Sequence, residues 1–82
     1  MKPDEVTRIL KESIAEEMGI AISEIEMDDT FFDLGLDSVT CIFVMDRVEK
    51  KLDITLNPVA FWDHPTVEAF SAHIEKVLQG AG

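Results

Sequence analysis

The sequence predicts an all-α protein, a small bundle of three longer helices and one short helix, with a long structured loop between the first two longer helices. Three segments, residues 4–18, 38–52 and 66–78, carry apolar residues at the three- and four-residue spacing of one helical face. Capping residues, glycine or proline lie at their ends. No segment shows the strict apolar–polar alternation that indicates a half-buried strand.

The first helix is expected over about Asp4 to Met18. Its apolar residues share one face: Val6, Ile9, Leu10, Ile14 and Met18. Asp4 and Glu5 fall in the first turn, where negative charge suits the helix dipole, and Gly19 is a typical stop.

A long connection follows, from Gly19 to Asp37. Loops of this length are uncommon in compact domains, but this one carries its own apolar anchors: Ile20, Ile22, Ile25, Met27, Phe31, Phe32 and Leu34. Ser23 and Glu26 have the spacing of a capping box, which predicts a short helical turn near Glu24 to Met27. We therefore expect a packed loop rather than a flexible linker.

The second helix is expected from about Ser38 to Leu52. Asn57-Pro58 then has the pattern of an N-cap followed by proline at the first helical position, which predicts a short helix through Trp62. Asp63-His64-Pro65 interrupts it, because a residue before proline avoids helical angles. Thr66 is expected to cap the last helix, whose apolar positions are Val67, Phe70, Ile74, Val77 and Leu78.

Size and charge limit the possible functions. We expect one domain over residues 1–82, with a core over about 4–78 and a tail or linker at 79–82. Seventeen acidic residues against seven basic ones give a net charge of −10, which disfavours nucleic acid as a partner and favours basic protein surfaces. The chain has no apolar run of the ~18 residues that span a membrane and no signal-peptide core. A cytoplasmic monomer without membrane association is therefore expected.

The second helix carries more apolar residues than one face needs. Its core-facing arc is expected to hold Ile42, Met45, Val48 and Leu52, with Cys41 and Val44 at the edges. Cys41 is the only cysteine, and we interpret it as a small buried hydrophobe that forms no internal disulfide. Val39 and Phe43 form a second stripe, which is either a docking patch or, in the case of Phe43, buried beneath the loop.

Ser38 lies where a glycine-opened loop turns into a helix. Asp37 and Ser38 are both favoured N-caps, so the Ser38 hydroxyl is expected at the positive end of a helix dipole, which suits a phosphate ester. By residue type alone, a plain helix cap is the more common role for a serine at this position. A hydrolytic serine is not expected, because Leu36 and Thr40 stand where a nucleophile elbow needs glycine. Neither histidine, His64 or His73, has a sequence context that links it to this serine.

Two sequence blocks resemble acyl carrier proteins. Phe31-Phe32-Asp33-Leu34-Gly35-Leu36-Asp37-Ser38 is similar to the approach to the modified serine of carrier domains. Phe61-Trp62-Asp63-His64-Pro65-Thr66 is similar to the block before the last helix of polyketide-type carriers. The resemblance runs from the first helix to Leu78. Val39 departs from it, since leucine is usual after the serine, but it keeps the apolar character.

The resemblance implies that a phosphopantetheinyl transferase esterifies Ser38 with 4′-phosphopantetheine from coenzyme A. The thiol of this arm would hold acyl groups as thioesters and present them to acyltransferase, ketosynthase and other synthase enzymes, so the chain itself would be no enzyme. Asp37 is expected to help the transferase through its magnesium ion, and Leu36 to offer it an apolar contact. Helix capping and loop packing are the alternative roles of these two residues.

The same resemblance indicates the polyketide type. Asp37 stands where carriers of peptide synthetases usually have histidine, and the His64-Pro65-Thr66 block favours polyketide over fatty-acid carriers. On the second helix, Asp46 and Glu49 alternate with basic residues, whereas fatty-acid carriers show a nearly continuous acidic face. Asp46 and Glu49 are expected to join Val39 and Phe43 in docking.

Other functions stay open at this point. A fatty-acid carrier or a peptidyl carrier would share the attachment serine. An acidic helical interaction module without a prosthetic group would share the charge, the size and the apolar stripe. Calcium binding is a weaker alternative, because the aspartates around the loop lack the spacing of an EF-hand, and no metal is expected.

Overall fold

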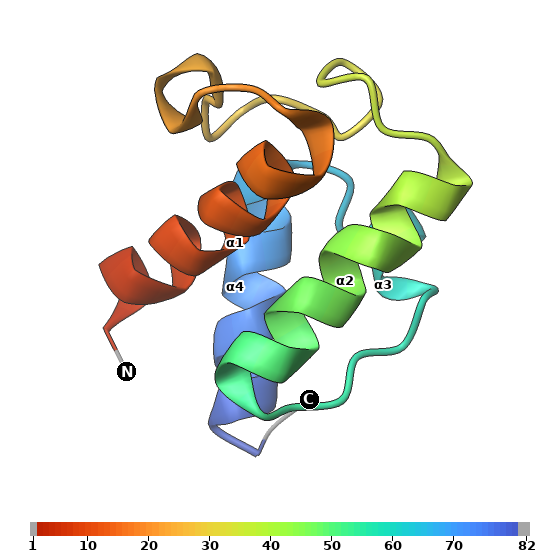
Figure 1. Cartoon of the computed structure of the whole chain (residues 1–82). Helices are drawn as coiled ribbons and strands as arrows, with labels where there is room; N and C mark the ends of the chain where they lie inside the picture. Colours follow the sequence, from red (N-terminus) through yellow and green to blue (C-terminus); the bar gives the residue numbers. More distant parts are fainter. Residues whose placement is uncertain (1, 81–82) are drawn as a thin grey trace.

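The computed structural model describes residues 2–80 and forms a helical bundle. It contains α1 (Pro3–Met18), α2 (Ser38–Leu52), α3 (Ala60–Asp63) and α4 (Val67–Leu78), with the short 3₁₀ helix η1 (Ile22–Glu24) in the long loop. Figure 1 shows α4 behind α1 and α2, with the loop after α1 crossing above all three. The described residues form no strand, and the all-α prediction is confirmed. The expected tail at 79–82 lies partly outside these residues.

Helix α1 matches its prediction within one residue. It begins at Pro3, where a proline costs no hydrogen bond because the first-turn amides have no intrahelical partner. It stops before Gly19, whose φ of 68° is left-handed and whose amide donates to the Ala15 carbonyl. The predicted apolar face is buried, with Val6, Leu10 and Ile14 fully covered.

Helix α2 has the predicted bounds but a narrower buried face. The core side consists of Cys41, Val44, Met45, Val48 and Leu52. The prediction for Ile42 is wrong, because this side chain is 51% exposed. At 100° per residue, Ile42 lies about a quarter turn from the centre of the buried face, so α1 and α4 do not reach it. Burial of Cys41 is confirmed.

The long loop is packed, as predicted, but two of its expected anchors, Ile22 and Phe32, are exposed, and its helical turn is shifted. Helix η1 spans Ile22–Glu24, and the predicted capping box of Ser23 and Glu26 and the turn at Glu24 to Met27 are wrong. Instead, the Ala21 amide donates to the Glu24 carboxylate, and the Glu26 amide donates to Asp29. The loop is then tied to the start of α4, because the amides of Val67 and Glu68 donate to loop carbonyls.

The short helix α3 also differs from its prediction. It spans Ala60–Asp63, so it starts after Asn57-Pro58 and ends one residue beyond Trp62. The Asn57 side chain accepts a hydrogen bond from the Val59 amide and so stabilises a turn before the helix instead of capping it. The predicted cap of α4 is confirmed, since the Thr66 hydroxyl oxygen accepts from the Ala69 amide.

Three aromatic rings join the loop, α3 and α4 in the core. Phe61 stacks on Phe70 with ring centroids 4.5 Å apart, and Phe31 meets both rings edge-on, at 4.9 Å and 5.5 Å. Aromatic contacts of this kind add to the free energy of area burial by about 0.5–1.5 kcal/mol per pair. The cluster therefore fixes the backbone of the loop and of α3 on either side of the α2 start.

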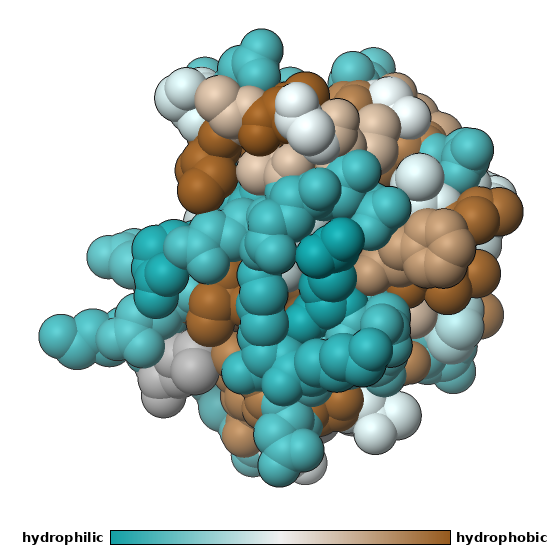
Figure 2. All heavy atoms as spheres, in the orientation of Figure 1, coloured by the Kyte–Doolittle hydropathy of each residue, from teal (hydrophilic) through white to brown (hydrophobic). Residues whose placement is uncertain are grey.

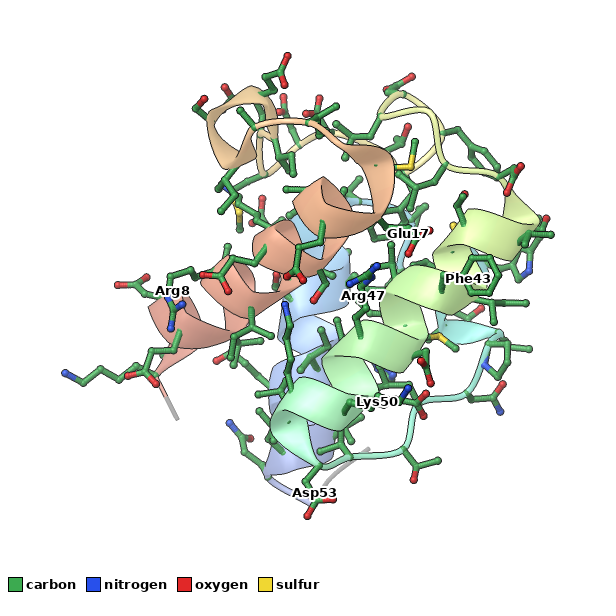
Figure 3. All side chains as sticks on the ribbon, viewed as in Figure 1. Arg8, Glu17, Phe43, Arg47, Lys50 and Asp53 are labelled. Carbon is green, nitrogen blue, oxygen red and sulfur yellow. The ribbon has the colours of Figure 1, made fainter. Side chains whose placement is uncertain are left out.

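Ion pairs join α1 and α2 on the opposite side of α2. Arg47 contacts Glu17 at 3.0 Å and Glu16 at 3.3 Å, and Lys51 also pairs with Glu16. Figure 3 shows the Arg47 side chain extending from α2 towards Glu17 on α1. The positive charges of α2 are thus largely neutralised by its neighbour. Within residues 2–80, no helix combines the length and apolar character needed to cross a membrane.

Candidate functional site

Ser38 is the first residue of α2 and is exposed to solvent. Its hydroxyl forms no hydrogen bond with any residue that the structure describes, so its oxygen is free to react or to carry a substituent. Ser13 and Ser71 are buried, which leaves Ser23 as the other exposed serine. Ser23 lies in the three-residue η1, whereas Ser38 opens a helix of 15 residues. Only Ser38 therefore combines exposure with the positive end of a long helix dipole.

Asp37, and not Ser38, is the N-cap of α2. Its carboxylate accepts a hydrogen bond of 2.9 Å from the Thr40 amide, and the Thr40 hydroxyl oxygen accepts one of 2.7 Å from the Asp37 amide. The Thr40 amide and the Thr40 hydroxyl both donate to the Asp37 carboxylate, and these two hydrogen bonds lower the pKa of that carboxyl below its ordinary value. Asp37 is therefore charged at neutral pH. Because Asp37 caps α2, the Ser38 hydroxyl is not needed as a cap.

The turn before Asp37 sets the position of Ser38. Gly35 has a φ of 93°, which only glycine adopts without strain, and an added Cβ would lie 3.3 Å from the Met18 side chain. Leu36 then turns inwards and is 2% exposed. The expected contact of Leu36 with a transferase is therefore not supported, because the side chain belongs to the core. Its alternative role, loop packing, fits the structure.

A small apolar cavity of about 100 Å³ adjoins Ser38. Its walls come from the long loop, the first turn of α2 and the α3 region: Phe31, Phe32, Ser38, Cys41, Ile42, Pro58, Phe61, Trp62 and Pro65. Burial, and to a lesser degree the charge of Asp37, raises the pKa of the Cys41 thiol. Cys41 thus stays protonated and lines the cavity as a hydrophobe.

The predicted docking residues on α2 lie in different surroundings. Val39 is 57% exposed and Phe43 is 50% exposed, so burial of Phe43 beneath the loop is ruled out. Figure 2 shows apolar surface gathered at the right-hand edge, beside the start of α2, where Figure 3 places Phe43. Asp46 is exposed and pairs with Lys50 at 2.9 Å. Glu49 instead accepts a hydrogen bond of 2.8 Å from the Leu56 amide, so its carboxylate holds the next connection in place.

The two histidines lie elsewhere. Their rings stack on each other between α3 and α4, with centroids 4.5 Å apart, and neither lines the cavity at Ser38. Over residues 2–80, no cluster of three or more potential metal ligands is present. The site thus offers an exposed hydroxyl, a charged capping carboxylate and an apolar cavity, and no base that would make Ser38 a nucleophile by itself.

One part of the site was not predicted. Phe32 and Trp62 are 60% and 66% exposed, and their ring centroids are 6.1 Å apart beside the cavity. Each follows a buried phenylalanine directly, Phe31 or Phe61. The sequence contains two pairs of adjacent aromatic residues, Phe31-Phe32 and Phe61-Trp62. Two neighbouring rings seldom face the same side of the chain, so these pairs could have indicated that one ring of each is exposed.

The comparisons agree with the geometry of this site. A family model described as "Phosphopantetheine attachment site" matches residues 8–74. The chain is 40% identical over 67 residues to the non-reducing polyketide synthase albA of Aspergillus niger, covering 82% of this chain and 3% of that protein. It is 29% identical over 79 residues to 5-methyl-1-naphthoate synthase of Streptomyces sahachiroi, covering 96% and 4%. The chain thus spans only a few per cent of these relatives.

Two solved structures are similar in fold and sequence. A free-standing peptidyl carrier protein from Acinetobacter baumannii has a TM-score of 0.86 at 28% identity, over 95% of this chain and 98% of that one. The HMG-ACPI domain of the CurA module from Lyngbya majuscula has a TM-score of 0.85 at 29% identity, over 96% and 80%.

Proposed function

Because the chain belongs to the family of phosphopantetheine attachment domains, we propose that Ser38 is the residue to which 4′-phosphopantetheine is attached. The observation that carries this proposal is the exposed, unbonded hydroxyl of Ser38 at the first position of α2. The helix dipole and the first-turn amides favour a phosphate group there. The residues present therefore fit the group.

The attachment step needs an external enzyme. The Ser38 Oγ attacks the pantetheine-bearing phosphorus of coenzyme A, a new P–O bond forms, and the pyrophosphate P–O bond breaks. Adenosine 3′,5′-bisphosphate leaves. The hydroxyl proton passes to a base of the phosphopantetheinyl transferase, since no residue that the structure describes accepts a hydrogen bond from the Ser38 hydroxyl. Asp37 holds the helix start through its Oδ1. We assign a second role to its negative charge, the attraction of the transferase's magnesium ion.

Members of this family are non-catalytic carriers that work with synthase enzymes. When bound, the group supplies a thiol that holds acyl intermediates as thioesters. We propose the polyketide type for this chain, as one carrier domain over residues 1–82. Support comes from the named polyketide synthases among its relatives, from Asp37 before the serine and from the His64-Pro65-Thr66 block. A monomer in the cytoplasm stays the predicted state, with acyltransferase and ketosynthase as predicted partners.

A peptidyl carrier is the second candidate, because a solved peptidyl carrier protein shares the fold over almost its whole length. Competitive loading separates the two. The protein is first incubated with coenzyme A and a transferase, and its intact mass should rise by one phosphopantetheine. The modified protein is then offered a malonyl-loading acyltransferase together with an amino-acid adenylation enzyme. We expect malonyl loading to exceed aminoacyl loading, as read by mass. Preferential aminoacylation would replace the polyketide assignment with the peptidyl one.

We further propose that Val39, Phe43 and Asp46 form a docking stripe for synthase enzymes on α2. Phe43→Ser should leave the free energy of unfolding within about 1 kcal/mol of wild type, because half of the ring is already in water. The rate of acyl transfer from at least one synthase enzyme should fall. Thermal unfolding and transfer kinetics measure the two effects, with Ile22→Ser as the control, since Ile22 is 43% exposed on η1. A large loss of stability in Phe43→Ser would contradict this role.

A further inference from the structure

The exposed pair of Phe32 and Trp62 has no role in the attachment chemistry. Both rings keep more than half of their surface in water, although aromatic side chains are usually well buried. They come from the long loop and from α3, and their ring planes meet at 46°. Both line the cavity that Ser38 also lines. Exposed aromatic side chains that lie together beside a reactive residue are typical of a binding site.

The core holds this pair in a fixed place. Phe31 and Phe61, the residues directly before Phe32 and Trp62, meet edge-on at 4.9 Å and are at most 9% exposed. Burial of the inner rings, Phe31 and Phe61, fixes the backbone of the loop and of α3. The outer rings, Phe32 and Trp62, project from these fixed backbone segments. A surface that is ordered before binding loses less conformational entropy when a partner arrives. The outer pair is therefore suited to anchor a partner.

Acidic residues are the direct sequence neighbours of the residues that form this surface. Asp33 follows Phe32, Asp63 follows Trp62, and Asp37 precedes Ser38; all three aspartates are exposed. None of them forms an ion pair with another residue within 2–80. Arg47 and Lys51 of α2 are directed towards α1, where they pair with Glu16 and Glu17, and Lys50 pairs with Asp46 on α2 itself. A matching partner surface would have an apolar groove with a basic rim, because such a rim attracts these carboxylates.

The position of Ser38 selects the partner. An enzyme that works on the far end of the phosphopantetheine arm can remain at a distance from the protein surface. An enzyme that forms the bond to Ser38 Oγ must bring its reacting phosphorus to that atom, so it has to cover the surroundings of Ser38. The cavity walls place Phe32 and Trp62 within those surroundings.

We propose that Phe32 and Trp62 form the anchor for the phosphopantetheinyl transferase, seated in an apolar groove with a basic rim. This inference rests on the proposed attachment at Ser38. Because the rings contact the enzyme and not the reacting atoms, they contribute equally to binding in the ground state and the transition state. Their loss should therefore raise KM and leave kcat unchanged.

The kinetics of arm transfer test the anchor. Initial rates are measured with coenzyme A and a transferase for wild type, Trp62→Ser, Phe32→Ser and the control Ile22→Ser. We expect KM to rise roughly tenfold in Trp62→Ser, the effect of one well-packed aromatic contact, with a smaller rise in Phe32→Ser. The KM of Ile22→Ser should equal that of wild type, because Ile22 lies on η1, outside the cavity walls.

A second measurement is independent of the folding of any variant. Trp62 is the only tryptophan of the chain, so wild-type protein made with 5-fluorotryptophan carries one fluorine signal. Addition of unlabelled transferase should shift this signal. An unshifted signal, or a Trp62→Ser variant with the wild-type KM, would overturn the anchor while the attachment at Ser38 stands. Wild type that gains no arm would overturn the proposed function itself.

Discussion

A Ser38→Ala variant is expected to fold like the wild type and to gain no phosphopantetheine. The substitution removes the one oxygen that would bond to phosphorus. It should change the free energy of unfolding by no more than about 0.5 kcal/mol, because the hydroxyl is exposed and forms no hydrogen bond among residues 2–80. Capping by Asp37 is untouched, and alanine is itself the best helix former. Intact mass after incubation with coenzyme A and a transferase, together with thermal unfolding, measures both expectations.

Ser23→Ala is the matched control, since Ser23 is the other exposed serine. It should be modified as wild type is. Asp37→Ala serves as the control for capping, and its melting temperature should fall where that of Ser38→Ala does not. A Ser38→Ala variant that still gains the arm would contradict the attachment site. A fall in melting temperature equal to that of Asp37→Ala would contradict the assignment of the cap.

The longer helices could be predicted because their signals are local and repeated. In α1, the apolar spacing and Gly19 together fix both ends within one residue, and Thr66 marks the start of α4. The short elements had no repeated pattern to follow. Helix η1 depends on the reach of the Glu24 carboxylate to the Ala21 amide, and α3 begins only after the turn that Asn57 stabilises. Single contacts of this kind compete with similar alternatives one or two residues away.

The candidate site, too, could be predicted only where its signals are local in the sequence. The position of Ser38 at a helix start follows from Gly35 and Asp37, which lie within three residues before it in the sequence. The burial of Leu36 depends on how the loop packs against the helices, and the contact of Glu49 with Leu56 depends on how the chain turns back after α2. Side-chain type alone shows neither arrangement. A loop also has no fixed periodicity to show which of two adjacent rings faces the core.

A Phe70→Ala variant is expected to lose about 3–5 kcal/mol of unfolding free energy. Phe70 is fully buried, and its ring contacts both Phe31 and Phe61, so alanine leaves a cavity where the loop, α3 and α4 meet. For a chain of this size, the total free energy of unfolding is about 4–12 kcal/mol, so one ring accounts for a large share. Urea unfolding at low temperature measures the loss, and Phe70→Leu, which fills part of the cavity, should lose less.

Phe32→Ala is the matched control for this variant, because it also removes a phenylalanine ring, but from a position that is 60% exposed. Its loss should stay below about 1 kcal/mol, since little buried area disappears. Equal losses in Phe70→Ala and Phe32→Ala would contradict the division into buried rings (Phe31, Phe61 and Phe70) and exposed rings (Phe32 and Trp62). That division also links stability to recognition. Phe70 supports Phe31 and Phe61, whose burial fixes the display of Phe32 and Trp62, so a folded Phe70→Leu should also bind the transferase more weakly, with a higher KM.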